Sequence, residues 1–231
     1  MTKISIVIPT LNEAKHIKKL LQHLRLNAFN KDNLEIIVVD GGSTDNTIEI
    51  ISAFEDVKLL SSEKGRAKQM NLGAHKALGE ILYFLHADSF PPKHYDKHIL
   101  SQIERGNEAG CFRLQFDSNH WWLKLASWLT QFSWRACRGG DQSQFIAKKL
   151  FEEIGGFNED YTIYEDNMLI NELYKRKQFV VINEKIVTSA RLYKKVGVWR
   201  LQYHFWTIYV KKWFGASPTE LYRYYKDHII S

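Results

Sequence analysis

Cysteine is scarce in this chain of 231 residues, which has only Cys111 and Cys137. The two do not form a CxxC pair, so the sequence indicates neither a disulfide framework nor a zinc cluster and favours a reducing, cytosolic setting. Long apolar runs are also missing, because no window approaches the roughly 18 uncharged apolar residues that a membrane span needs. The first apolar stretch, Ile4 to Pro9, is too short for the core of a signal peptide. We therefore expect a protein that is neither secreted nor membrane-spanning.

Two common nucleotide-binding motifs are absent as well. There is no GxGxxG after the first predicted strand and no GxxxxGK[ST] anywhere, which removes the main support for a dinucleotide-binding or P-loop protein. Internal repeats and Gly/Ser-rich linkers are missing too. The hydrophobic share of 45% and the charged share of 25% are typical of a soluble globular protein. The length suits one large α/β domain or one domain with an appendage.

Positive charge is concentrated in the last quarter of the chain. The net charge is +6, but residues 175–231 alone hold twelve Lys and Arg against three Asp and Glu, so residues 1–174 are net negative. The same quarter is rich in Trp, Tyr and Phe. Such an asymmetry favours an anionic partner, which could be a membrane surface, a nucleic acid or a phosphorylated substrate. A solvated basic face over an ordinary core is the simpler alternative.

Short apolar strands and amphipathic helices alternate through the first ninety residues. Asn12 is interpreted as the N-cap of the first helix, and Gly65 and Gly79 as the start and end of the third. Strands that alternate with helices in this way specify an open, mostly parallel sheet with right-handed connections. The predicted strands cover residues 5–9, 34–39, 57–60 and 81–85.

The last of these strands ends in polar residues that suit a ligand site. Residues 81–85 are continuously apolar, as in a strand buried on both faces, and His86, Ala87 and Asp88 follow directly. Ligands of such sheets bind beyond the carboxyl ends of the strands. An aspartate there can hold a divalent cation that in turn holds a diphosphate. A strand-ending aspartate that only caps the next turn is the alternative.

Two further polar points are expected at the same edge of the sheet. Asp40 ends the second strand and precedes two glycines, which would let a ligand approach the backbone. Arg66 lies in the first turn of the third helix, whose N-terminus attracts anions. Together these residues suit a nucleoside diphosphate. Asp40 could bind the nucleobase or the ribose, Arg66 could bind the phosphates, and a metal ion at Asp88 could lie beside them.

The motifs around these points are specific enough to suggest a family. Residues 5–13 (SIVIPTLNE) and 38–45 (VVDGGSTD) resemble the opening signatures of family 2 glycosyltransferases, which have the GT-A fold. Residues 65–74 (GRAKQMNLGA) and 84–88 (FLHAD) resemble one bacterial subgroup of that family. The resemblance covers nearly the whole chain and is strongest over 4–90 and 139–170. It implies a Rossmann-like, mixed but mostly parallel sheet flanked by helices.

The resemblance also implies how a UDP-sugar donor would be bound. The first segment and Asp40 would hold the uridine, Arg66 would face the diphosphate, and Asp88 would bind Mg²⁺ or Mn²⁺. The donor-binding residues implied in this way are Pro9, Thr10, Asn12, Glu13, Asp40, Arg66, Asn71, Ala87 and Asp88.

One position departs from the family pattern. Many members carry Asp-x-Asp where this chain has His86-Ala87-Asp88. A metal ligand at His86 would favour Mn²⁺ over Mg²⁺, and a histidine that merely finishes the strand is equally open. Arg191 closes a stretch shared with the subgroup and is a further candidate for a phosphate contact.

Two acidic patterns in the second half carry the proposed catalysis. Paired acids at a helix start, such as Glu165-Asp166, are often only complements to the helix dipole. In family 2 enzymes the aspartate of this pair is the general base, so the resemblance assigns the base to Asp166 and a supporting role to Glu165. A Gly-Asp-Gln pattern lies near the acceptor in that family, which implies acceptor-side roles for Asp141 and Gln142.

The remaining elements are read from periodicity. A Trp-rich helix is predicted over 121–134, with Trp122, Leu125, Ala126, Leu129 and Phe132 either in the core or lining a groove for an apolar acceptor. A helix follows Gln142 and ends at Gly155, and short strands are predicted at 179–182 and 186–190.

Two basic aromatic helices are predicted to end the chain. Trp199, Tyr203, Trp206, Val210 and Trp213 form one aromatic stripe on a helix that ends at Gly215. A capping box at Ser217–Glu220 then opens the last helix. We divide the chain into a GT-A domain, 1–198, and a C-terminal helical extension, 199–231. These helices could lie on an anionic bilayer, fold back over the active site or pair with a second subunit.

Together these features predict a metal-dependent, inverting, hexosyltransferase-type glycosyltransferase. It would move a sugar from a nucleotide-diphosphate donor to an acceptor hydroxyl, for example of a lipid or cell-envelope glycan. A nucleotidyltransferase and a non-catalytic module that binds membrane or nucleic acid are the alternatives, although we do not expect a nucleic-acid partner. We expect a cytoplasmic protein and leave open an association with the inner face of the cell membrane. The motifs fix neither the sugar, the acceptor, the metal nor the oligomeric state.

Overall fold

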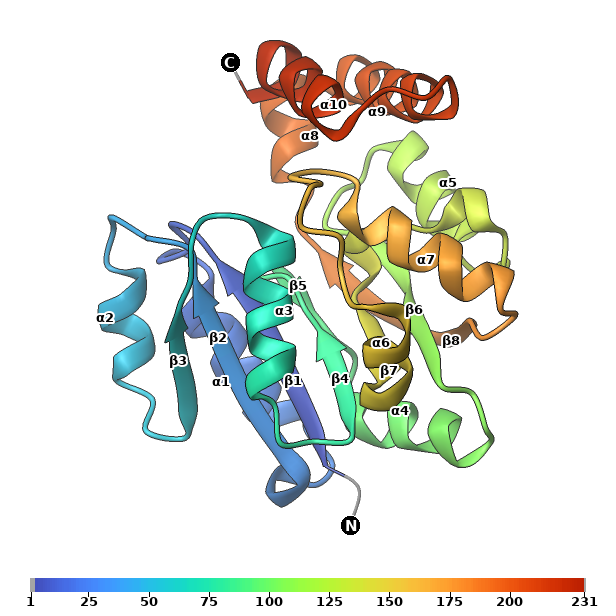
Figure 1. The fold of residues 1–231 in the computed structure, drawn as a ribbon. Helices are drawn as coiled ribbons and strands as arrows, with labels where there is room; N and C mark the ends of the chain where they lie inside the picture. The colour runs from blue at the N-terminus through green and yellow to red at the C-terminus, as the bar shows by residue number, and fades with distance from the viewer. Residues whose placement is uncertain (1–2, 231) are drawn as a thin grey trace.

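A computed structural model describes residues 3–230 and places eight strands in one sheet, in the order β3-β2-β1-β4-β7-β6-β8-β5 (Figure 1). The first four strands are parallel: β1 (Ile4–Thr10), β2 (Leu34–Asp40), β3 (Val57–Ser61) and β4 (Ile81–Phe84). The others are β5 (Ser89–Phe90), β6 (Ala109–Phe116), β7 (Gln144–Ala147) and β8 (Val180–Thr188). Here β7 is antiparallel to β4 and β6, while β6 and β8 are parallel. The predicted mixed, mostly parallel sheet is therefore confirmed.

Helices cover both faces of the sheet, so the central strands β1, β2, β4 and β7 are buried on both sides. One apolar cluster joins the sheet to α1 (Ile17–Asn27), α2 (Thr47–Ser52), α4 (Tyr95–Glu104) and α5 (Trp121–Leu129). A second joins the other face to α3 (Arg66–Lys76), α6 (Lys148–Ile154) and α7 (Glu165–Lys175). Burial of both faces is why the central strands are continuously apolar rather than alternating.

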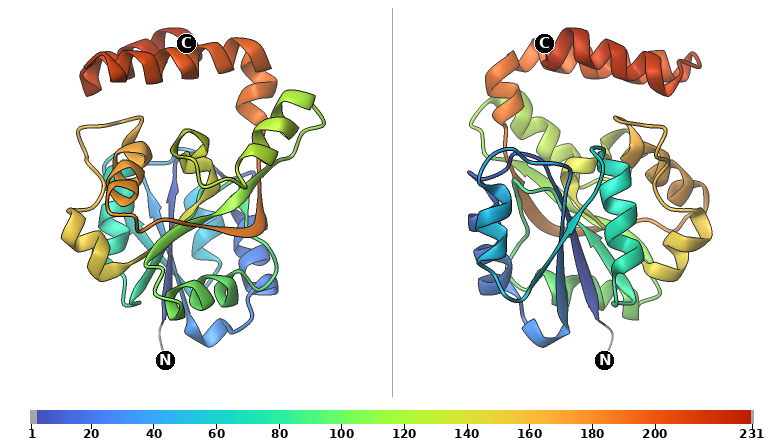
Figure 2. Two further views of the ribbon diagram at one scale, coloured as in Figure 1. Left: turned by 90° about the vertical axis from the view of Figure 1, so that its right-hand side faces the viewer. Right: turned by 60° about the vertical axis from the view of Figure 1, so that its left-hand side comes forward.

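The C-terminal helices lie beyond the carboxyl ends of the parallel strands, on the side of the molecule opposite the N-terminus (Figures 1 and 2). They are α8 (Arg191–Val196), α9 (Val198–Trp213) and α10 (Pro218–Tyr225), followed by a π-helical turn, Lys226–Ile230. Leu201 and Ile208 of α9 share an apolar cluster with Tyr161 and Ile163 of the loop before α7. The extension is therefore packed against the loop before α7, and its contact with a bilayer or a second subunit stays a prediction. The division at residue 198 stays a prediction.

The described helices include none with the length and apolar character required to cross a bilayer.

Two predicted helix boundaries in the first half are wrong. Asn12 does not cap α1, which begins at Ile17; it lies in the loop with a φ of 56° and accepts a hydrogen bond from Thr44 N. Gly79 does not end α3, whose last residue is Lys76. It lies where the chain turns into β4, and a Cβ there would be 2.5 Å from the carbonyl oxygen of Lys3. Close backbone approach, rather than helix termination, requires this glycine.

Three predicted elements in the second half also differ. The segment after Gln142 first forms β7, an antiparallel partner of β4, and only then α6. The two predicted strands near 179–190 are one strand, β8, with a register irregularity between residues 182 and 185 opposite β6. The Trp-rich helix ends at Leu129, and its buried residue is Leu123, whereas Leu125 is 39% exposed. The predicted core register of this helix was therefore wrong.

The helical prediction for the tail is confirmed. Helix α9 ends just before Gly215, which has a φ of +90°. Ser217 and Glu220 form the predicted capping box, with Pro218 at the first helical position.

Candidate active site

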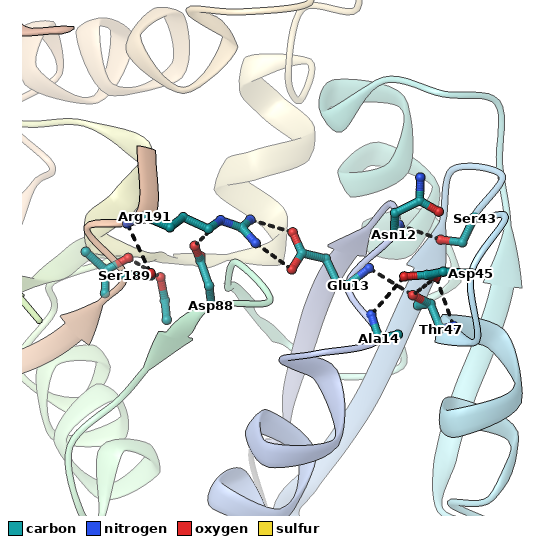
Figure 3. A network of polar contacts seen from close by, with 11 residues as sticks. Asn12, Glu13, Ala14, Ser43, Asp45, Thr47, Asp88, Ser189 and Arg191 are labelled. Atoms are coloured by element: carbon teal, nitrogen blue, oxygen red, sulfur yellow. Dashed lines mark hydrogen bonds and ion pairs between the residues drawn. The ribbon is translucent and has the colours of Figure 1, made fainter. Parts of the chain in front are cut away.

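Two loops beyond β1 and β2 are joined by reciprocal hydrogen bonds (Figure 3). The backbone N–H of Asn12 donates to Ser43 Oγ at 2.8 Å, and Asn12 Oδ1 accepts from Thr44 N at 2.8 Å. The backbone N–H of Glu13 donates to Thr47 Oγ1 at 2.8 Å. Residues 11–14 and 42–47 therefore form one fixed rim at the carboxyl edge of the sheet.

Asp40 is buried at the base of this rim. Its carboxylate accepts the backbone N–H groups of Gly42 and Ser43, both at 2.8 Å. Gln69 of α3, also buried, donates through Nε2 to the carbonyl oxygens of Thr10 at 2.8 Å and Val39 at 2.7 Å. Because Gln69 fastens the ends of β1 and β2 together, it is a positioning residue that the sequence reasoning did not assign. A polar residue on the otherwise apolar face of α3 was the available signal.

Arg191 connects Asp88 with Glu13 (Figure 3). Its Nε lies 3.2 Å from Asp88 Oδ2, and its Nη1 and Nη2 donate to the two carboxylate oxygens of Glu13 at 2.9 and 2.5 Å. The hydrogen bonds to Glu13 are the largest cause of a raised Arg191 pKa, and the charge of Asp88 adds to them. Pairing of β5 with β8 produces this arrangement, since Ser89 lies opposite Thr188. A residue that the sequence marked only as a candidate phosphate contact thus lies between two predicted donor-binding residues.

A second arginine, Arg66, joins α3 to the start of α7. Its Nε is 2.9 Å from Oε1 of Glu165, a fully buried carboxylate. Burial raises the pKa of the Glu165 carboxyl to about 7, although the Arg66 guanidinium favours its ionised form. The charges of Glu165, then Asp166 and Asp141, raise the pKa of Arg66. The predicted base Asp166, 9% exposed, therefore lies close enough to Arg66 to interact with it electrostatically.

The raised pKa of Glu165 gives a prediction about stability. An acid whose pKa is raised by folding keeps its proton when the unfolded chain has released it, so the free energy of unfolding should fall between about pH 4.5 and about pH 7. Glu165→Gln should remove this component, roughly 3 kcal/mol. Urea unfolding of both proteins across this pH interval measures it. An identical pH dependence in the two proteins would contradict the assignment.

Asp141 and Gln142 lie together in the one-turn helix Gly140–Gln142 but have different environments. Asp141 is exposed, and its charge contributes to the raised pKa of both Arg66 and Arg191. Gln142 is buried, accepts from Arg138 Nη1 at 2.7 Å and donates to the Cys137 carbonyl at 2.6 Å. Gln142 and the buried Arg138 hold the turn that presents Asp141 to the two arginines. An acceptor-side role for this pair stays a prediction.

Three other predicted site residues have their own surroundings. The Asn71 side chain donates to the Phe157 carbonyl oxygen and Glu159 and accepts from Phe157 N, so both ends of its amide are engaged outside the rim. Ala87 is buried, and His86 is half-buried. Their donor and metal roles stay predictions.

The residues around Asp88 suit a cation that is shared with a diphosphate. Within residues 3–230 no group of three His, Cys, Asp or Glu side chains could hold a metal by itself. Mg²⁺ sites in phosphate-transferring proteins often use one or two carboxylates, with phosphate oxygens and water completing the shell. The guanidinium of Arg191 against Asp88 shows that this carboxylate favours a positive charge beside it. Asp88, with His86 as the second candidate, therefore fits such an ion.

The C-terminal layer contributes tyrosines near the same acids. Tyr209 of α9 donates its hydroxyl to Asn167 Oδ1 at 3.3 Å, one residue beyond Asp166. Burial raises the pKa of Tyr225 of α10, and the charges of Arg66, Asp141 and Glu165 also act on it. Sequence reasoning did not assign these tyrosines, because more than forty residues separate each from the acids it meets.

This arrangement defines the class of the fold, and solved structures agree. The Mannosyltransferase PcManGT from Pyrobaculum calidifontis, in complex with GDP-Man and Mn²⁺, superposes with a TM-score of 0.70 at 19% identity, over 99% of this chain and 68% of that one. Staphylococcus aureus TarS 1-349 in complex with UDP gives 0.69 at 20% identity, over 81% and 60%. Both are GT-A glycosyltransferases, and the fold of this chain is GT-A.

The sequence model for "Glycosyl transferase family 2" matches residues 5–159, and the chain belongs to this family. An uncharacterized glycosyltransferase of Haemophilus influenzae is 36% identical over 232 residues, covering 89% of this chain and 88% of that protein. A Methanococcus voltae dolichyl N-acetyl-alpha-D-glucosaminyl phosphate 3-beta-D-2,3-diacetamido-2,3-dideoxy-beta-D-glucuronosyltransferase is 33% identical over 112 residues, 46% of this chain. The match spans only 35% of that protein, and 19% of full-length TarS. The predicted family is confirmed.

Proposed function

We propose that this protein transfers a hexose-type sugar from a nucleotide-diphosphate donor, UDP-linked in the first instance, to an acceptor hydroxyl with inversion at the anomeric carbon. The observation that carries the proposal is the meeting of Arg191, Asp88 and Glu13 with Arg66, Glu165 and Asp166 at one sheet edge, with Asp141 acting on both arginines. Named relatives support the donor class: structures of TarS hold UDP or UDP-GlcNAc, and PcManGT holds GDP-Man and Mn²⁺.

The donor would lie along the rim of residues 11–14 and 42–47, with its diphosphate toward Arg66 and Arg191. Asp88 and His86 are the residues that would hold a divalent ion, Mg²⁺ or Mn²⁺, which supplies positive charge for the departing diphosphate. Both arginines would stabilise the negative charge of the same departing diphosphate. Fixed positive groups are most effective where negative charge develops in the transition state.

The acceptor would approach from the side of Asp141 and α7. Asp166 takes the proton of the attacking hydroxyl, because it is the less buried carboxylate of the pair, while Glu165 holds Arg66 in place. A single displacement, in which the hydroxyl deprotonated by Asp166 attacks the sugar directly, inverts the configuration at the anomeric carbon. The acceptor class we propose is a hydroxyl of a lipid or a cell-envelope glycan.

A thermal-shift screen of nucleotide sugars, with and without Mn²⁺, tests the proposal. Ligands that bind the folded state raise its melting temperature, so at least one nucleotide sugar should raise it, and more in Mn²⁺ than in EDTA. A response only to nucleoside triphosphates would favour a nucleotidyltransferase instead. That alternative is disfavoured because the loop after β1, Thr10-Leu11-Asn12-Glu13, is not the glycine-rich basic loop such enzymes use.

Replacing Arg191 should affect metal and nucleotide in opposite directions. In the free protein the guanidinium neutralises Asp88, so Arg191→Ala should strengthen the binding of Mn²⁺ alone several-fold. The same change removes a charge-assisted contact to the diphosphate and should weaken UDP binding in the presence of Mn²⁺ about tenfold or more. Isothermal titration calorimetry measures both affinities.

Arg25 provides the matched control for this experiment. It pairs with Asp56 on the surface, through Nε and Oδ2 at 2.9 Å, so Arg25→Ala should leave both affinities unchanged. If Arg191→Ala weakened Mn²⁺ binding or left UDP binding intact, the proposed exchange of partners at Arg191 would be wrong.

A further inference from the structure

The aromatic stripe of α9 faces away from the apolar cluster that holds the helix in place. Leu201 and Ile208 are the buried residues of α9. The stripe residues lie on the opposite side of the helix and are about half exposed or more, up to 85% for Trp213. Residues with this much apolar surface in water do not stabilise the described fold through burial. Their exposure needs another explanation.

Exposed aromatic side chains continue from α9 onto α5. Trp199 lies 5.6 Å from Trp121 and 5.3 Å from Trp122, measured between ring centroids. At the other end of α9, Trp213 and Phe214 are in contact at 5.6 Å. We define the aromatic face as the exposed apolar residues of these two helices and of the turn after α9, apart from Tyr209, which bonds to Asn167: Trp121, Leu125, Trp128, Trp199, Tyr203, Trp206, Val210, Trp213 and Phe214.

The two helices of the aromatic face also carry exposed basic side chains. Lys124 of α5 and Arg200 and Lys211 of α9 are exposed, and residues 175–231 carry twelve Lys and Arg against three Asp and Glu. Basic residues near an anionic bilayer strengthen binding by electrostatic attraction to the headgroups. The charge therefore complements a surface of negative headgroups.

We propose that the aromatic face docks onto an anionic lipid bilayer, lying on its surface without crossing it. Tryptophan and tyrosine are the residues that settle at the membrane interface, because the ring is apolar and the N–H or O–H reaches water. Helices with an aromatic side and flanking Lys and Arg bind in the plane of the headgroups. A nucleic acid would need aromatic platforms set within a basic groove. Here the basic residues lie beside an aromatic face that also contains Leu125 and Val210.

Helix α9, which carries most of the aromatic face, lies beyond the carboxyl ends of the parallel strands (Figures 1 and 2). Helix α9 carries the stripe on one side, and its Tyr209 bonds to Asn167 beside Asp166. Docking through α9 would therefore hold the site close to the membrane surface. The inference does not rest on the proposed function, because it concerns only exposed side chains of α5, α9 and the turn after α9.

Vesicle flotation with the full chain tests the inference. The protein should float with vesicles of phosphatidylcholine and phosphatidylglycerol, float far less with phosphatidylcholine alone, and be released by high salt. The double variant Trp213→Ala/Phe214→Ala should weaken binding at least about tenfold, because two large side chains leave the interface. Arg200→Gln/Lys211→Gln should weaken it by a similar factor and reduce the salt dependence.

Exposed leucines elsewhere give the matched control. Leu26 in the last turn of α1 and Leu78 after the end of α3 are 78% and 75% exposed, so Leu26→Ala/Leu78→Ala should bind vesicles as the wild type does. All variants should keep their melting temperature and UDP response, which separates this test from that of the proposed function. Equal binding by the aromatic variant and the wild type would overturn the inference. Absence of vesicle binding would also overturn it, whether the protein then bound a single-stranded oligonucleotide or formed a dimer that Trp213→Ala/Phe214→Ala dissociates.

Discussion

Asp166→Asn should lower the turnover number by about 10²–10⁴-fold, the range that a positioned general base contributes, while UDP affinity in Mn²⁺ stays nearly unchanged. Asparagine has the size of aspartate but cannot accept the proton of the attacking hydroxyl. Glu165 is not a substitute base in this variant, because it is fully buried and lies 2.9 Å from Arg66. Release of UDP from the donor, measured with and without acceptor, reports turnover, and calorimetry reports UDP binding.

A control variant at a second acid, in the loop before α7, distinguishes the loss of a general base from the loss of one negative charge. Asp160 is exposed in the loop before α7, so Asp160→Asn changes the net charge equally and should leave turnover intact. If Asp166→Asn abolished UDP binding together with turnover, Asp166 would belong to the donor site and would not be the base. Turnover close to that of the wild type would exclude it from catalysis altogether.

The parallel half of the sheet could be predicted because its signals are local. Residues 81–84 are continuously apolar and buried on both faces, and the polar residues that follow each strand must meet at the carboxyl edge. That reasoning placed Asp40, Arg66 and Asp88 at one edge, where the structure has them. The order of these strands was not predicted, because β1 pairs with β4, as in Ile4 opposite Ile81, across a long stretch of sequence.

The antiparallel half was less predictable because its strands depend on distant partners. β7 has four residues and becomes a strand by pairing with β4, more than sixty residues earlier in the chain. Helix α5 has Trp and Leu on most of its surface, so the pattern did not distinguish the buried Leu123 from the exposed Leu125.

The contact between Arg191 and Glu13 was not predicted for the same reason, because it depends on the pairing of distant strands. The ion pair between Glu13 and Arg191 spans 178 positions of sequence. It exists because β5, a strand of two residues, pairs with β8. Motifs can identify both partners as polar residues near a strand end, but only the pairing of strands shows that they meet.

Asp88→Ala should abolish turnover and remove the part of UDP binding that depends on the metal. We expect wild-type UDP affinity to be at least about tenfold higher in Mn²⁺ than in EDTA, since the ion links carboxylate and diphosphate. In Asp88→Ala the UDP affinities in Mn²⁺ and in EDTA should be equal, because the carboxylate next to Arg191 that would hold the ion is gone. Calorimetry of UDP in the two buffers measures this ratio directly. Asp56→Ala, which removes a surface carboxylate paired with Arg25, should keep the wild-type ratio.

Combining this change with Arg191→Ala distinguishes competition at Asp88 from a general electrostatic effect of the arginine. If Arg191 weakens Mn²⁺ binding by occupying Asp88, its removal should strengthen Mn²⁺ binding only while Asp88 is present. In the Asp88→Ala background, Arg191→Ala should therefore have no effect on the binding of Mn²⁺ alone. A gain of the same size in both backgrounds would mean that Arg191 acts on the metal through its charge at a distance. The direct contact between Arg191 and Asp88 would then have no part in metal binding. If Mn²⁺ still strengthened UDP binding in Asp88→Ala, the metal would be held by other residues.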